Sequence, residues 1–216
     1  MPKHKSLSPA DGETEQRILE AARRVFIRRG TAGARMQEIA AEAGVNQALL
    51  HYYFRTKERL SSAVFAQIAS RIFPALVQIL GGDRPLSEKV DALIAAYLDM
   101  LARNPFLPGY LIAELHHHPE RVRNLLTTAT GARPEQIFAP VKARIAAQIQ
   151  AEVTAGRMRP MSPEQFIVNL VSLCIFPFAA RPMLGILLEL DDGAFAQFIE
   201  ERKTLLPAYV HSALRP

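Results

Sequence analysis

Hydrophobic residues recur along most of the chain at the three- and four-residue spacing of an α-helix. In residues 12–29 the apolar positions with this spacing are Ile18, Leu19, Ala22, Val25 and Phe26. A stripe of this kind is typical of a helix that buries one face. No segment shows the alternation of apolar and polar residues, bounded by hairpin turns, that indicates a β-strand. The pattern therefore predicts an all-α fold.

Glycines divide the first part of the chain into short helices. Gly30 is expected to end the first helix, because glycine tolerates the left-handed backbone that closes a helix. Gly44 supplies a tight turn between a helix over residues 36–43 and another over residues 47–53, for which Asn46 is a good N-cap. The pattern predicts three short helices in the N-terminal region.

Proline becomes frequent after this region. None occurs between Pro9 and Pro74, whereas residues 74–216 contain thirteen. Prolines at the first turn start helices, and prolines inside them cause bends. The change predicts a three-helix domain over residues 1–60 and a larger helical bundle over residues 61–216.

The start of the long fourth helix and several starts in the bundle are signalled locally. Thr56 is expected to cap a long helix that runs to about Phe73, where Pro74 interrupts it. Ser162-Pro163-Glu164-Gln165 has the form of a capping box with proline at the first helical position. Further starts are expected at Ser87, at Asn104-Pro105, at Pro134 or Pro140, and at Asp191.

The composition, with 49% apolar and 22% charged residues, is ordinary for a globular protein. The single Cys174 excludes an internal disulfide and is expected to be a small buried hydrophobe. Residues 1–16 are polar and lack the apolar segment of a secretory signal. The longest apolar stretches fall short of the ~18–20 residues of a membrane helix. These features predict a soluble cytoplasmic protein.

Positive charge is concentrated near the N-terminus. The net charge is +5, and residues 1–60 hold 11 Lys/Arg against 7 Asp/Glu, while the remaining residues hold 15 against 14. This distribution is expected if the N-terminal domain meets a polyanion. The first basic residues, at positions 3–5, are interpreted as a tail, with an arm in the minor groove of DNA as the alternative. The arginine pairs at 23–24 and 28–29 are interpreted as a solvated helix face.

Residues 43–58, AGVNQALLHYYFRTKE, place a glycine turn before a short helix that ends in three aromatic residues. Two short helices joined by such a turn form a helix-turn-helix, and its second helix fits the major groove of B-DNA. At 100° per residue, Leu50 and Phe54 point to the domain core. The residues on or near the opposite face are Gln47, Ala48, His51 and Tyr52.

The side chains on and around that face suit contacts with DNA. Gln47 can pair with an adenine edge, and Ala48 can touch a thymine methyl group. Lys57, in the first turn of the next helix, can meet a phosphate together with free backbone N–H groups. The candidates for hydrogen bonds to phosphate oxygens are His51, Tyr52 and Tyr53.

The segment MQEIAAEAGVNQALLHYYFRTKERL resembles the helix-turn-helix signature of TetR/AcrR-type transcriptional regulators. The matching positions are Ile39, Ala40, Ala43, Gly44, Val45, the cap Asn46, the aromatics Tyr52, Tyr53 and Phe54, and Lys57, Glu58 and Leu60. The resemblance covers about residues 12–60. Beyond it, the chain agrees with the family only in length, helix content and position.

Three positions depart from the signature. His51 stands where tyrosine is common, Leu49 replaces a small residue, and Arg35 replaces the usual Ser/Thr cap of the second helix. Arg35 loses the cap but can bind phosphate directly. The predicted DNA-binding residues are Arg35, Gln37, Asn46, Gln47, Ala48, His51, Tyr52, Tyr53 and Lys57.

The resemblance implies a ligand-responsive repressor. It implies a homodimer that reads a palindromic DNA operator with one three-helix domain per subunit, and that leaves the operator when a small-molecule effector binds the C-terminal domain. The last two helices of such proteins commonly pair with those of the partner, and the candidates here are residues 162–178 and 192–213. An apolar stripe alone also fits the core of one chain. The predicted interface residues are Phe166, Leu170, Phe195, Phe198, Ile199, Arg202, Leu206 and Tyr209.

The effector site can be placed only coarsely. Pockets in helical bundles lie between helices and are mostly apolar. The candidates are Tyr97, Met100, Phe106, Tyr110, Phe138, Phe176 and Met183. Few charges lie among them, which favours a hydrophobic or aromatic effector, and no cofactor is expected.

Two alternatives to a specific repressor each fit part of the sequence. A non-specific architectural DNA-binding protein has the same basic N-terminal region. A metal-binding or enzymatic module can be imagined around His116, His117 and His118, but three consecutive histidines point in different directions, so a helix end or a loop is preferred. The sequence has no nucleophile elbow and no phosphate-binding loop. We therefore expect neither a metal site nor an enzyme.

Overall fold

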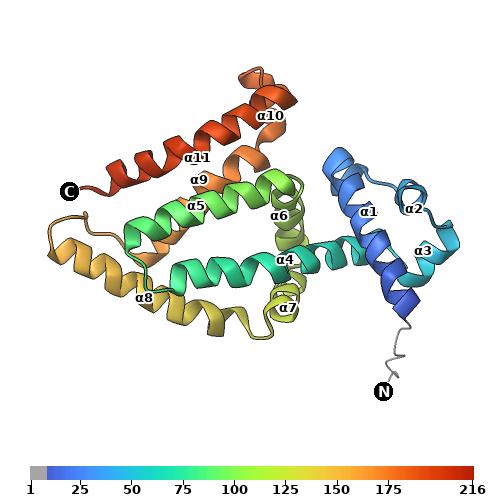
Figure 1. Ribbon diagram of the computed structural model, residues 1–216, viewed down its shortest axis with the longest axis horizontal. Helices are drawn as coiled ribbons and strands as arrows, with labels where there is room; N and C mark the ends of the chain where they lie inside the picture. The colour runs from blue at the N-terminus through green and yellow to red at the C-terminus, as the bar shows by residue number, and fades with distance from the viewer. Residues whose placement is uncertain (1–8) are drawn as a thin grey trace. The chain divides into compact units, whose positions relative to one another are not determined.

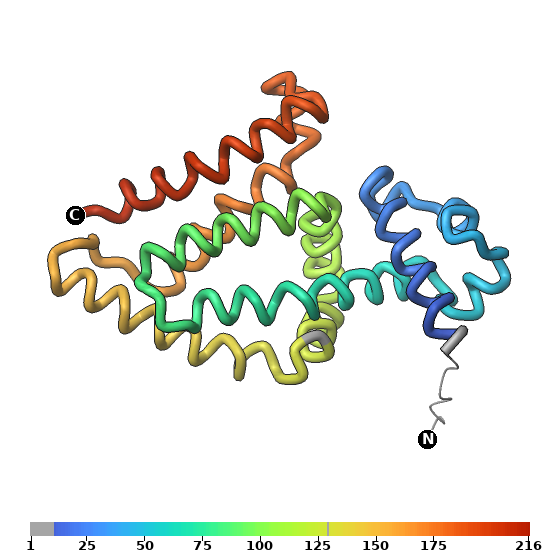
Figure 2. Tube along the Cα trace, in the orientation of Figure 1, coloured from blue at the N-terminus to red at the C-terminus, as the bar shows by residue number. Residues whose placement is uncertain are grey.

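The computed structural model describes residues 9–216 and is all-α, which confirms the predicted fold class. The helices, labelled in Figure 1, are α1 (Pro9–Gly33), α2 (Met36–Ala43), α3 (Gln47–Tyr53), α4 (Lys57–Gly81), α5 (Leu86–Arg103), α6 (Leu107–His117), α7 (Pro119–Thr130), α8 (Pro134–Thr154), α9 (Pro163–Ala179), α10 (Arg181–Leu187) and α11 (Asp192–Leu214). Figure 2 traces the same path as a tube. The chain divides within α4, between Ile68 and Ala69, into two compact units. The predicted boundary after residue 60 stays a prediction.

The first unit contains α1, α2, α3 and the start of α4 around one small core. The stripe predicted on the first helix is confirmed, since Ile18, Val25 and Phe26 have no exposed surface. Ile39 of α2 and Leu50 of α3 are also fully buried. Each short helix therefore contributes an apolar side to the same core, and its other side is left for solvent or a partner.

The glycine turns of this unit follow the sequence closely. Gly44 adopts the left-handed conformation, with φ of 65°, and its N–H donates to the carbonyl of Ala41 at 3.1 Å. The predicted bounds of α2 and α3 are confirmed. Gly30, with φ of 66°, interrupts α1, but helical residues continue to Gly33. The expected helix end at Gly30 is therefore a kink, because the chain resumes its helical conformation after one left-handed residue.

α4 corrects the expectation of a helix end near Phe73. Thr56 caps its start as predicted, since the hydroxyl accepts the N–H of Arg59 at 3.3 Å. The helix then continues through Pro74 to Gly81. Proline removes one backbone donor and crowds the preceding turn, but it does not prevent a helix that packing stabilises. The residues after Pro74 supply that packing, with Leu80 buried in the core of the second unit.

Two apolar segments correct the expectation that no stretch is long enough to cross a membrane. α4 reaches a mean hydropathy of 1.6 over 18 residues, and α9 with α10 passes the same test as a pair bent by 67°. Both segments supply residues to the core of the second unit, Leu80 from α4 and Phe166 from α9. Length and composition alone therefore do not separate these core helices from membrane spans.

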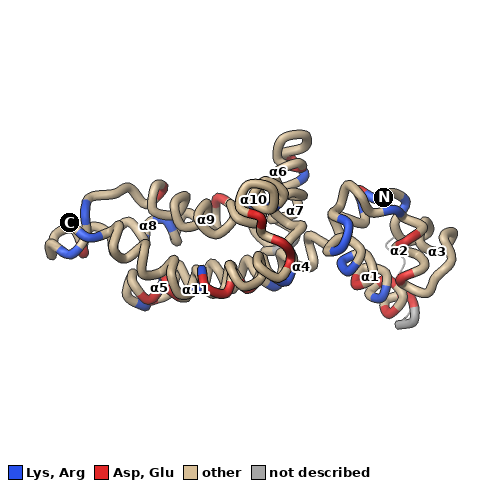
Figure 3. The backbone as a smooth tube through the Cα atoms, turned by 90° about the horizontal axis from the view of Figure 1, so that it is seen from above, with Lys and Arg blue, Asp and Glu red and all other residues tan. Residues whose placement is uncertain are grey.

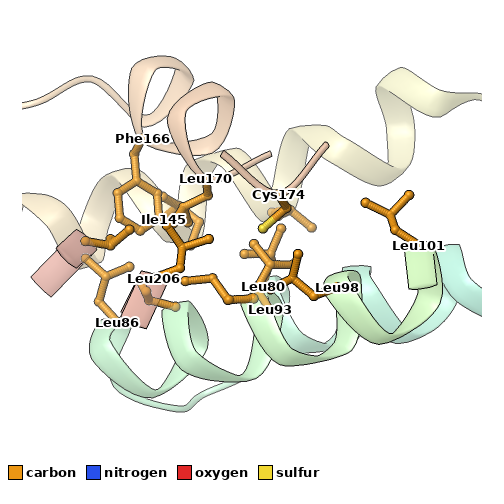
Figure 4. Packing of buried hydrophobic residues seen from close by; sticks show 14 of the residues in the cluster. Leu80, Leu86, Leu93, Leu98, Leu101, Ile145, Phe166, Leu170, Cys174 and Leu206 are labelled. Atoms are coloured by element: carbon orange, nitrogen blue, oxygen red, sulfur yellow. The ribbon is translucent and has the colours of Figure 1, made fainter. Parts of the chain in front are cut away.

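The second unit is built around one continuous apolar cluster. Figure 4 shows side chains from several helices converging, with Leu93 and Leu98 of α5, Ile145 of α8, Phe166, Leu170 and Cys174 of α9, and Leu206 of α11 among those labelled. Cys174 is fully buried, as predicted. Burial raises the pKa of its thiol to about 12. The cysteine is therefore a packing residue and is protonated at neutral pH.

Helix starts in the second unit agree with the sequence where a side chain makes the cap. Ser162 accepts the N–H of Gln165 at 3.2 Å, and Asp191 accepts that of Ala194 at 2.8 Å. The start expected at Asn104-Pro105 is wrong, because Asn104 is buried as the C-cap of α5 and α6 begins at Leu107. The Asn104 amide donates to the carbonyl of Met100 at 3.0 Å, so this side chain bonds back to the last turn of α5.

Lys89 is a buried charge that the sequence did not reveal. Its side chain on α5 has no exposed surface. The ammonium donates to the carbonyl of Leu80, in the last turn of α4, and to Oε1 of Gln148 on α8, both at 2.7 Å. The Gln148 amide in turn donates to the carbonyl of Arg84 at 2.8 Å. One lysine therefore ties the end of α4 to α5 and α8.

We expect Lys89→Met to lower the free energy of unfolding by about 2 kcal/mol, because one buried and one partly buried acceptor lose their donor. Burial lowers the pKa of Lys89, so the unfolded chain binds more protons than the folded chain below the ordinary lysine pKa, and wild-type stability rises with pH in that range. The gap between wild type and variant should therefore widen as the pH rises toward the ordinary lysine pKa in denaturant titrations. A gap that stays constant over that range would contradict a lowered pKa for Lys89.

Candidate nucleic-acid interface

α3 is anchored at both ends and along one side. Oδ1 of Asn46 accepts the N–H of Leu49 at 2.7 Å, which confirms the predicted N-cap. At the other end, the N–H of Phe54 donates to the carbonyl of Leu50 at 2.8 Å. Leu50 and Phe54 are both buried, as predicted. A helix of seven residues is not stable alone, so these anchors set its orientation.

The outward face of α3 carries the residues that the helical periodicity assigned to it. Gln47, Ala48 and His51 are exposed, and Tyr52 exposes 67% of its surface. An amide, a methyl group, an imidazole and a phenol therefore lie side by side on the surface of a fixed helix. Their individual contacts with bases and phosphates stay predictions.

Two of the predicted phosphate ligands have partners inside the protein. The Tyr53 hydroxyl donates to Oδ1 of Asp11 on α1 at 3.0 Å, and burial followed by this hydrogen bond raises the pKa of Tyr53. Nδ1 of His51 lies 3.2 Å from the carbonyl of Arg55. Sequence reasoning missed Asp11, because a partner 42 residues away gives no local signal. Tyr53 therefore joins α3 to α1, and Tyr52 is the more accessible phenol.

The start of α2 adds two exposed polar side chains. Arg35 is the N-cap residue of α2 and makes no side-chain cap hydrogen bond, which confirms the expected loss of the cap. Arg35 and Gln37 are both exposed, and neither side chain has a hydrogen bond or ion pair within the described residues. A guanidinium without a protein partner is free to meet a phosphate.

The arginines of α1 are paired with α2. Arg24 and Arg28 each lie 2.7 Å from a carboxylate oxygen of Glu42, and Arg29 lies 3.7 Å from Glu38. The hydrogen bond from Arg24 and then that from Arg28 lower the pKa of Glu42. Figure 3 shows blue and red positions together on α1 and α2. The interpretation of these arginines as a solvated, paired helix face agrees with these contacts, and Lys3, His4 and Lys5 lie outside the described residues.

Comparison with known proteins identifies the family. A model of bacterial regulatory proteins of the tetR family matches residues 18–64. The HTH-type transcriptional repressor NicS of Pseudomonas putida is 24% identical over 186 residues, 82% of each chain. The repressor SCO4008 of Streptomyces coelicolor is 32% identical over 128 residues, 57% of this chain and 65% of that protein. The DNA-binding domain of this chain is of the TetR family.

A solved structure shows the same fold for the whole chain. The crystal structure of a transcriptional regulator from Saccharomonospora viridis in complex with choline has a TM-score of 0.61 at 21% identity, covering 88% of this chain and 95% of that chain. Residues 18–64 therefore form a TetR-type helix-turn-helix DNA-binding domain, and the similar curated proteins are transcriptional regulators.

Lys57, part of the TetR signature, braces the DNA-binding unit. Its ammonium donates to the carbonyl of Ala32 at 2.9 Å and to that of Ala34 at 3.2 Å, in the connection between α1 and α2. The backbone carbonyl of Lys57 accepts the Ser61 hydroxyl at 2.8 Å. Lys57 therefore fixes the start of α4 against the entry to the helix-turn-helix, and a phosphate contact by its remaining N–H stays a prediction.

The predicted effector residues do not surround the two cavities described in the second unit. One, of about 300 Å³, lies between α9 and α11 and is lined by residues including Asn169, Ser172 and Tyr209. The other, of about 220 Å³, lies near the start of α5 beside Arg157 and His211. None of the seven effector candidates lines either cavity.

The seven candidates instead fall into three environments. Tyr97 and Met100 pack against the core cluster. Tyr110 is buried and Phe106 is half-buried. The exposed candidates are Phe138, Phe176 and Met183. The first four, on α5, on α6 and just before α6, remain as effector candidates shielded from solvent.

Most residues predicted for the dimer interface lie in the core of the chain. The buried ones are Phe166, Leu170, Phe195, Ile199 and Leu206. Phe198 is half-buried, and the Arg202 guanidinium donates to the carbonyl of Leu173 at 2.9 Å. The strongest apolar stripe of α9 and of α11 faces its own bundle, which corrects the placement. Tyr209 is exposed, as an interface residue must be in the free chain.

The histidine cluster lies at the junction of two helices. His116 and His117 are in the last turn of α6, and His118 separates α6 from α7, which starts at Pro119. This confirms the interpretation as a helix end. Within residues 9–216 no group of three or more metal-ligating side chains is close enough to hold a metal ion.

We expect Lys57→Met to lower the free energy of unfolding by about 1 kcal/mol, because two carbonyls lose a charged donor at a partly exposed site. The salt dependence of DNA binding tests whether Lys57 also contacts a DNA phosphate. If Lys57 contacts a phosphate, the plot of log binding constant against log salt concentration should be flatter for Lys57→Met than for the wild type, by roughly one unit per subunit. An unchanged slope together with lower stability would limit Lys57 to bracing. Lys142→Met, on α8, is the matched control.

Proposed function

We propose that the protein is a sequence-specific repressor that binds a palindromic operator as a homodimer and leaves it when a small effector binds. The observation that carries this proposal is the outward face of α3, where Gln47, Ala48, His51 and Tyr52 lie on a helix whose other side is buried. Two such helices would enter successive major grooves about one helical turn apart. A reader of chromosomal operators works in the bacterial cytoplasm.

The exposed sides of α9 and α11 support the homodimer. Val168 and Phe176 on α9, and Leu205 and Tyr209 on α11, are large apolar residues that expose more than half of their surface. They lie opposite the stripes that face the core. Exposed large apolar residues gathered on one side of a helix are typical of association sites. We therefore assign the dimer interface to these sides of the last long helices.

The effector is a small molecule that enters the helical unit. The related S. viridis regulator was crystallised with choline, which shows that this fold accommodates a small organic ligand. Tyr97, Met100, Phe106 and Tyr110 are the apolar candidates that the bundle shields. Effector binding would release the operator by favouring a conformation in which the two readers no longer match the groove spacing.

Gln47→Ala should weaken binding to the cognate operator by about 1–3 kcal/mol and relax one base position, because a bidentate base contact is lost. Fluorescence anisotropy with duplexes tiling the DNA upstream of the gene, beside a random duplex, measures both effects. The wild type should bind one fragment ~10³-fold above the random control. Gln150→Ala, an exposed glutamine on α8, is the control. Uniform weak binding in tiling and in selection from random duplexes would instead support an architectural DNA-binding protein.

Leu205→Asp should raise the dimer dissociation constant by at least about 30-fold, because a charge would be buried in the interface. Sedimentation velocity over a concentration series measures the change. Leu115→Asp, at an exposed apolar position of α6, should leave the dimer intact. A Leu205→Asp protein that remains dimeric would place the interface elsewhere.

A further inference from the structure

Glu114 on α6 carries a carboxylate oxygen that the protein leaves without a donor. Its Oε2 is fully buried and has no hydrogen-bond partner within the described residues. The side chain as a whole is 15% exposed. The closest cation is Arg121 on α7, whose Nη1 lies 3.9 Å from Oε2, too far for a hydrogen bond.

An ionised carboxylate in this position is costly for the folded protein. A buried charged group without a hydrogen bond keeps most of its desolvation penalty. Buried charges usually have hydrogen-bond partners, as Lys89 in the same unit does with two acceptors at 2.7 Å. Oε2 of Glu114 has no such hydrogen-bond partner, and a buried polar atom without a partner points to a ligand or a functional role.

The surroundings of Glu114 combine one negative charge with an aromatic side chain. Tyr110 lies one turn earlier on α6 and is buried, and residues four apart share one face of a helix. α6 packs against α7 and α9. The approach of Arg121 shows that the side of Oε2 toward α7 receives a cationic group. A carboxylate beside an aromatic ring suits an organic cation, because the ring attracts positive charge and the carboxylate accepts N–H hydrogen bonds.

We propose that Glu114 is the anionic anchor of an effector site for an organic cation with N–H groups, such as a primary ammonium or a guanidinium on an apolar body. This inference rests on the proposed effector-responsive repressor and names the chemical class of its effector. The ligand cation donates to Oε2 from the side that Arg121 now approaches, and the apolar body lies toward Tyr110. Bound ligand thus replaces Arg121 as the neighbour of Glu114 and changes how α6 and α7 are held together.

The test uses the full-length protein and three probes of similar size: 2-phenylethylammonium, neutral 2-phenylethanol and benzyltrimethylammonium, which has charge but no N–H group. Isothermal titration calorimetry should show the tightest binding for 2-phenylethylammonium. Glu114→Gln, which keeps the side-chain shape, should weaken that binding by about 10- to 100-fold. Glu120→Gln, on the exposed start of α7, removes the same charge and should have no effect.

Thermal unfolding separates a ligand anchor from a structural ion pair. Without probe, Glu114→Gln should be at least as stable as the wild type, because a buried charge without a donor is removed. Lower stability of both Glu114→Gln and Arg121→Gln, with no preference of the wild type for the ammonium, would overturn the proposal. Equal binding of the ammonium and the alcohol, or no binding of either, would also overturn it. Without probe, both the wild type and Glu114→Gln should bind the operator, and a wild type that binds no operator in the absence of probe would instead contradict the proposed repressor.

Discussion

The burial of Leu50 against the three-helix core is the constraint on which the DNA-reading surface depends. α3 has only seven residues, so its position cannot come from its own helical stability. Leu50 and Phe54 fix one side of it in the core, and Asn46 fixes its first turn. Once these are set, the helical repeat of 3.6 residues leaves Gln47, Ala48, His51 and Tyr52 no position except the surface.

Long-range contacts in the first unit fix α1 and α4 as well as α3, so the whole three-helix unit is held in one arrangement. Tyr53 joins the end of α3 to Asp11 on α1, and Lys57 joins the start of α4 to the carbonyls of Ala32 and Ala34. Aromatic and basic residues next to a recognition helix look like DNA ligands in the sequence. In the structure, two of them hold the helix-turn-helix together, and this bracing is independent of any contact they make with phosphate.

The sequence predicts features that depend on a few neighbouring residues. The turn at Gly44 follows from one glycine with positive φ, and the caps at Asn46, Ser162 and Asp191 follow from side chains that bond within three residues. It fails where packing decides. α4 passes Pro74 because Leu80 is buried, and Asn104 caps the end of α5 instead of the start of α6.

Most residues predicted for the dimer interface lie in the core of the chain instead. α11 carries apolar residues on its exposed side as well as on its buried side, so periodicity alone cannot say which of them meet the chain's own core. The more continuous apolar stripe of α11, with Phe195, Ile199 and Leu206, packs within the chain. Leu205 and Tyr209 remain exposed. A sequence stripe on a terminal helix of a bundle therefore indicates the core first, and the association surface is found among the apolar residues that remain.

Lys89 and Glu114, both in the second unit, show how a charge that the fold compensates differs from one that it leaves without a donor. Lys89 lies between acceptors from α4 and α8, so its charge is compensated by the fold itself. Glu114 has a cation nearby on α7 but no donor within hydrogen-bond distance. Neither position stands out in the sequence, where a lysine and a glutamate on amphipathic helices are ordinary surface residues. Only the geometry of their neighbours distinguishes them, because a charge that stabilises the fold must have its partners in the free protein, whereas a charge that recognises a ligand must lack one.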